Sequence, residues 1–98
     1  MSLEAGNRPH FVAECFWPNV QRTDVAALDR RLALHASPTA VHVGTVLVPE
    51  DEVVFVWFDA TLVDDVLRTC LAASVPFDRV VAVEGLPAVS VPSQPERD

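Results

Sequence analysis

The first patterned segment of the chain alternates between apolar and polar positions over residues 10–17. A period of two residues predicts a β-strand, because successive side chains of a strand point to opposite faces of its sheet. One side of this strand is expected to meet the core, and the other carries the polar side chains of His10 and Glu14. The core-facing positions are Phe11, Ala13, Cys15 and Trp17.

Two later segments repeat apolar residues at helical spacing, which predicts two amphipathic helices. The first is expected to begin at Thr23 and to end before Pro38, and the second to begin at Thr61 and to end before Pro76. Threonine is a favourable helix N-cap, and proline displaces the residue before it from helical geometry. The apolar stripes are Val25, Leu28, Leu32 and Ala36 in the first helix, and Val63, Val66, Leu67, Cys70, Leu71 and Ser74 in the second.

Runs of β-branched and aromatic residues predict three more strands, over residues 39–48, 53–59 and 80–83. A short acidic turn at residues 49–52 joins the first two of these strands into a hairpin. The resulting order, β-α-β-β-α-β, predicts an α+β fold of the ferredoxin-like plait type. We therefore expect a four-stranded antiparallel sheet with both helices on one face.

The predicted plait occupies residues 10–85 as one domain, since a chain of 98 residues has no room for a second core. Residues 1–9 are expected to form a flexible N-terminus, and residues 86–98 a proline-rich tail or extended arm. The sheet face without helices is too apolar to remain in water. We therefore expect a homodimer, in a dimeric α/β-barrel-type assembly that buries this face.

Composition narrows the classes of partner and chemistry. Fourteen acidic against seven basic residues give a net charge of −7, which argues against nucleic acid, because phosphate binding needs clustered bases. No apolar run is long enough for a membrane span, and residues 1–9 lack the apolar centre of a signal peptide, so we expect a cytoplasmic protein without a membrane partner. The absence of lysine excludes Schiff-base chemistry and pyridoxal attachment. Cys15 and Cys70 lack the spacing of zinc ligands and are expected to be buried thiols.

Three stretches of the chain together carry a family resemblance, namely A-V-H-V at 40–43, V-F-V-W-F-D-A at 54–60 and V-P-F-D-R-V at 75–80. The last supplies a proline, an acid, a base and a β-branched residue between the second helix and the final strand. The set resembles a family of small bacterial proteins of unknown function with a ferredoxin-like fold, one member of which binds nickel. The resemblance implies a dimer that binds a small molecule or a divalent transition metal such as nickel.

The sequence departs from this family's pattern in two places. Val56 replaces a hairpin cysteine that is common in the family, and residues 62–73 hold no histidine where the nickel-binding type often carries one. His42 alone occupies a position where that type also has a histidine.

Three polar residues form the predicted metal site. If the strand over residues 39–48 alternates strictly, with Val41 and Thr45 facing the helices, His42 shares the uncovered face with His10 and Glu14. Two imidazoles and a carboxylate are suitable ligands for a divalent transition metal. The alternative is that His42 is a structural histidine that bonds to a partner subunit.

The same face predicts a site for a small organic ligand. His42 and Glu14 would supply polar groups, and Trp57 and Phe58 would line an apolar cavity. The preferred hypothesis is a homodimeric binding protein for a small molecule or a metal ion. The alternatives are a cofactor-free isomerase or monooxygenase with His42 as acid and base, and a structural assembly module. We assign no catalytic residue, because fold analogy alone supports the enzyme hypothesis.

Overall fold

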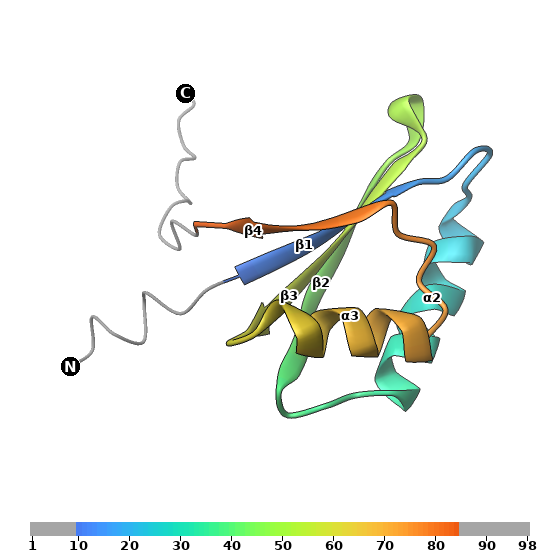
Figure 1. The fold of residues 1–98 in the computed structure, drawn as a ribbon. Helices are drawn as coiled ribbons and strands as arrows, with labels where there is room; N and C mark the ends of the chain where they lie inside the picture. The colour runs from blue at the N-terminus through green and yellow to red at the C-terminus, as the bar shows by residue number, and fades with distance from the viewer. Residues whose placement is uncertain (1–9, 85–98) are drawn as a thin grey trace, which may run out of the picture.

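The structure is a computed structural model that describes residues 10–84. Within this range the elements follow the order β-α-β-β-α-β, with a short 3-10 helix, η1, in the hairpin (Figure 1). The predictions made for residues 1–9 and 86–98 lie outside the described residues. The elements are β1 (His10–Phe16), α2 (Arg22–Leu34), β2 (Ala40–Val48), η1 (Pro49–Asp51), β3 (Val53–Ala60), α3 (Val63–Ala72) and β4 (Arg79–Val83).

The strands form one antiparallel sheet in the order β2-β3-β1-β4, so that β3 and β1 are central. Helices α2 and α3 pack against the same face of this sheet, as Figure 1 shows. The predicted α+β class, the four-stranded antiparallel sheet and the two helices are thereby confirmed. The element succession and the strand order are compatible with a ferredoxin-like plait.

The hydrophobic core lies between the sheet and the two helices. Strand β1 contributes Phe11, Ala13 and Cys15, as its alternation predicts. Both central strands therefore direct every second side chain toward the helices, and these buried positions explain why the sheet and helices hold together. The largest fully buried side chains are Phe58, Leu28, Leu32, Val54, Val56, Val66, Cys15 and Cys70.

The helices begin at slightly different residues from those predicted. Helix α2 starts at Arg22, because the Asp24 carboxylate accepts a hydrogen bond of 2.8 Å from the backbone N–H of Gln21 and closes the first turn. Helix α3 starts at Val63, two residues after Thr61. No helix in residues 10–84 has the length and apolar character that a membrane span requires.

Cys15 and Cys70 are both free and fully buried, as predicted. Burial raises the pKa of Cys15 from 9.0 to about 12, with smaller contributions from Cys70 and Asp78, and burial raises the pKa of Cys70 to about 11. In the unfolded chain both thiols ionise near their ordinary pKa. At pH values between the ordinary and the raised pKa, the folded state holds more protons than the unfolded state. The free energy of unfolding therefore falls as the pH rises.

We expect the free energy of unfolding to be about 2 kcal/mol lower at about pH 10 than at about pH 8, since each thiol contributes about 1 kcal/mol over this whole interval. The chain holds no tyrosine and no lysine, which leaves the thiols as the side chains that titrate in this range. Urea unfolding at the two pH values measures the change. A double Cys15→Ala, Cys70→Ala variant should lose this pH dependence, and an equal decline in that variant would contradict the assignment.

Candidate functional site

Strand β2 contains a β-bulge between His42 and Gly44, and this bulge decides where His42 points. Before the bulge His42 pairs with the core residue Phe58, and after it Thr45 pairs with the core residue Val56. Paired residues share a face, so both His42 and Thr45 lie on the helix-covered side of the sheet. The strict alternation expected for this strand is therefore wrong here, and so is the face predicted for His42.

A chain of hydrogen bonds links β2 to α2 through His42, Thr45 and Asp29. The Thr45 hydroxyl donates to Asp29 Oδ1 at 2.7 Å and lies 2.8 Å from His42 Nε2. His42 Nε2 is itself 3.9 Å from Asp29 Oδ1. The imidazole also packs against Phe58, with ring centroids 5.9 Å apart. These contacts fix the histidine ring from the helix side and from the core side.

The same hydrogen bonds determine which nitrogen of neutral His42 carries the hydrogen. An ionised carboxylate only accepts hydrogen bonds, so the single hydroxyl proton of Thr45 goes to Asp29. The Thr45 oxygen must then accept from the imidazole, which places the ring hydrogen on Nε2. The lone pair of neutral His42 is left on Nδ1.

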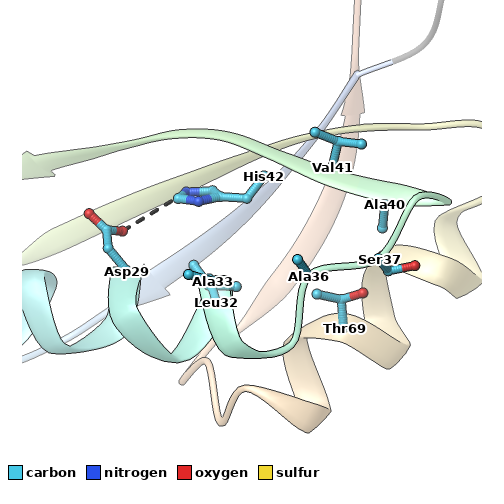
Figure 2. A pocket seen from close by; sticks show the side chains of 9 residues that line it. All are labelled: Asp29, Leu32, Ala33, Ala36, Ser37, Ala40, Val41, His42 and Thr69. Carbon is cyan, nitrogen blue, oxygen red and sulfur yellow. Dashed lines mark ion pairs between the residues drawn. The ribbon is translucent and has the colours of Figure 1, made fainter.

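A cleft of about 260 Å³ lies beside His42, between the C-terminal part of α2 and the start of β2 (Figure 2). This volume is slightly below the range of about 300 to 1,000 Å³ that is usual for small-molecule sites. Its wall consists mainly of small apolar side chains, and Asp29 is the charged residue at the end where His42 lies. The cleft is lined by Asp29, Leu32, Ala33, Ala36, Ser37, Ala40, Val41, His42 and Thr69.

The sheet face opposite the helices, called the open face below, carries the other predicted polar residues. His10 and Glu14 both lie there, on β1. Glu14 is already paired, since its Oε1 accepts a hydrogen bond of 2.7 Å from Arg79 Nε on the neighbouring strand β4. That hydrogen bond raises the pKa of Arg79.

The three predicted metal ligands do not converge. His10 and Glu14 are four residues apart on one strand, which separates their backbones by about 13 Å. His42 lies on the opposite face of the sheet. Among residues 10–84, no three His, Cys, Asp or Glu side chains are grouped closely enough to hold a metal ion.

The two aromatic residues predicted to line a ligand cavity also separate. Trp57 lies on the open face, where it pairs with Val12, and is half-buried. Phe58 is fully buried in the core on the other face. Neighbouring residues of a strand point in opposite directions, so the two rings do not line one cavity.

Comparison of the chain with protein-family models, curated proteins and solved structures finds no match. The resemblance to the small bacterial family stays a prediction.

Two residues of the His42 site, Asp29 and Thr45, are not singled out by the sequence. Asp29 stands next to two arginines on the polar side of a predicted helix, and Thr45 stands among valines in a predicted strand. The one feature of the sequence that points to this site is Gly44, because an isolated glycine within a strand pattern is typical of a β-bulge. That signal indicates a change of face after His42 without identifying the partner on α2.

Proposed function

We propose that this protein binds a small molecule in the cleft beside His42. The observation that carries the proposal is the placement of a histidine, fixed by Thr45 and Asp29, at the polar end of an otherwise apolar cleft. Sites for small molecules combine an apolar wall with a few fixed polar groups that orient the ligand. The His42 side chain is 24% exposed, so it is held in place and is also accessible.

A library of small neutral aromatic molecules, screened by amide chemical shifts, tests this proposal. Compounds that bind should shift the amides of Ala33, Ala36 and Val41, which line the cleft from α2, from the segment after α2 and from β2. The Leu62 amide, next to an exposed side chain outside the cleft, provides a comparison. Compounds that shift only residues outside the cleft would contradict the proposal.

Replacing His42 by alanine is expected to weaken the binding of such compounds about tenfold, which corresponds to the loss of one hydrogen bond. The free energy of unfolding should fall by only about 1 kcal/mol, because the Thr45–Asp29 hydrogen bond does not need the ring. Titration of one cleft-binding compound into both proteins measures the effect on affinity. Unchanged affinity would assign His42 a purely structural role.

We further propose that the protein acts as a homodimer joined through the open face. Three apolar side chains on this face remain about half exposed, namely Phe16 at 58%, Val46 at 48% and Val41 at 45%. Apolar residues also occupy the centre of the face, where Phe55, Trp57 and Val81 are partly exposed and Val12 is buried. A sheet face that carries this many apolar side chains beside the Glu14–Arg79 ion pair favours a protein partner.

The size of the open face is consistent with a second copy as that partner. Four strands about 4.8 Å apart and about seven residues long make a face of about 450 Å². Two copies would therefore bury a total of about 900 Å² if both faces were flat, and protruding side chains add to this area. The total is close to the roughly 1,000 Å² of buried surface that a specific interface needs. Because His42 faces the helices, His42→Ala should leave the dimer dissociation constant unchanged.

A metal ion is not part of this proposal, because His42 lies on the opposite face from His10 and Glu14. An assembly module without a ligand is the alternative that the compound screen tests. It would be favoured by a stable dimer in which no compound shifts the residues of the cleft.

A further inference from the structure

We propose that His42 accepts a proton, through Nδ1, from a neutral and weakly acidic ligand such as a phenol or an enol. This inference rests on the proposed binding of a small molecule in the cleft and names the chemical class of that molecule. His42 is the proton acceptor, and Thr45 and Asp29 are positioning residues that act through it.

Of the two ring nitrogens of His42, Nε2 is already bonded within the protein. The Thr45 hydroxyl occupies Nε2, so the lone pair of neutral His42 is on Nδ1. The ring belongs to the cleft wall, and the cleft is the space beside it into which a ligand fits (Figure 2). A hydroxyl group of the ligand can donate a hydrogen bond to this nitrogen.

Two polar side chains, Thr45 and Asp29, lie beside Nε2 of the ring. Asp29 Oδ1 lies 3.9 Å from His42 Nε2, close enough for an ion pair once the imidazole becomes positive. Thr45 accepts from Nε2 in both the neutral and the charged ring, so no hydrogen bond has to be rearranged. Fixed partners of this kind are what makes a histidine an effective general base.

The charges near the cleft favour a ligand that arrives neutral. Asp29 is the charged residue among those that line the cleft, and the chain carries a net charge of −7. A carboxylate or phosphate would meet a negative wall, on which residues 10–84 place no arginine. The apolar wall formed by Leu32, Ala33 and Ala36 instead suits the hydrocarbon or aromatic part of a neutral molecule.

The proposed step is a single proton transfer. The O–H bond of the ligand breaks and an Nδ1–H bond forms on His42. The ligand keeps the bonding electron pair as an oxyanion, and the ring becomes an imidazolium flanked by the oxyanion and Asp29. No oxidant, reductant or second reactant is needed.

The first test needs no ligand. Nitrogen-15 spectra of the histidine rings, recorded above about pH 7.5 where an ordinary imidazole is neutral, report the ring tautomer. We expect His42 to carry its hydrogen on Nε2 and that hydrogen to be protected from exchange in the wild type and in Thr45→Ser. Thr45→Val lacks the hydroxyl and should lose this protection. A hydrogen on Nδ1 in the wild type would overturn the inference.

The second test uses 4-nitrophenol, whose neutral and ionised forms absorb at different wavelengths. At a pH where the free compound is mostly protonated, the bound compound should show a phenolate fraction about tenfold higher than the free compound, because an opposite charge nearby stabilises the anion. His42→Gln should abolish this phenolate signal, and Asp29→Asn should reduce it. Amide shifts of the cleft residues establish that the compound is bound there.

The outcomes separate this inference from the proposed function. If 4-nitrophenol binds in the cleft but stays protonated, the inference fails and the binding function stands. If neither 4-nitrophenol nor any compound of the neutral library shifts the cleft residues, the binding function fails, and the inference fails with it. A phenolate signal that persists in His42→Gln would also overturn the inference.

Discussion

Replacing Phe58 by alanine is expected to lower the free energy of unfolding by about 3 to 5 kcal/mol, the range typical of large-to-small changes of a buried phenylalanine. Phe58 heads the fully buried side chains by volume and lies on the central strand β3. Its neighbours across the sheet are Phe11 on β1 and His42 on β2. The change would leave a cavity in the middle of the core and remove the ring against which His42 packs.

Urea unfolding, followed by tryptophan fluorescence, measures this effect. Leu34→Ala is a suitable control, because Leu34 is 82% exposed and its removal should change stability by less than about 0.5 kcal/mol. If Phe58→Ala cost no more than Leu34→Ala, Phe58 would not be a core residue. Its predicted place in a ligand cavity would then have to be reconsidered.

The second large effect is expected from a charge on the open face. Val46→Glu should raise the dimer dissociation constant at least about 100-fold, because a symmetric interface would bury two unpaired carboxylates, each at a cost of several kcal/mol. Val46 is 48% exposed, so the folded subunit itself should tolerate the change. Sedimentation velocity over a range of concentrations measures dissociation, and circular dichroism verifies that the variant is folded.

A matched variant distinguishes the effect of placing a charge on the open face from the effect of adding a charge anywhere on the subunit. Leu34→Glu adds the same charge at an exposed site on α2, on the helix side of the sheet, and should leave the dimer intact. The dimer proposal fails if the wild type sediments as a monomer at micromolar concentration. It also fails if Val46→Glu and Leu34→Glu have equal effects on dissociation.

The periodicity of the sequence was sufficient to predict the secondary structure and the class of fold. Alternation identified Phe11, Ala13 and Cys15 as core residues of β1, and all three are buried. Helical spacing identified Leu28 and Leu32 in the same way. These predictions succeed because the direction of a side chain in a regular element depends only on the position of its residue along that element.

The dependence of side-chain direction on position along a strand also explains why the predicted ligand site is wrong. Trp57 and Phe58 are neighbours on one strand, so a period of two already places them on opposite faces. Only the burial of Val54, Val56 and Phe58 decides which of the two faces the helices. His10 and Glu14 do share a face, but distance along the strand keeps them from sharing a ligand.

The tertiary structure alone decided the environment of His42. Ala40 at the start of β2 is buried, and Leu47 near its end packs against the core. These two residues are an odd number of positions apart in the sequence, so both can face the helices only if one residue is accommodated in a bulge. That bulge turns His42 toward α2, where it meets Asp29 through Thr45.

The sequence by itself therefore determined which elements form, their order and most of the core, because these depend on local periodicity. It did not determine the candidate site, because that site depends on the pairing register of β2 and on a contact with α2 across 16 positions of the chain. Such a contact forms only when the helix packs on the sheet, and the free energy of that packing comes from the apolar residues around it.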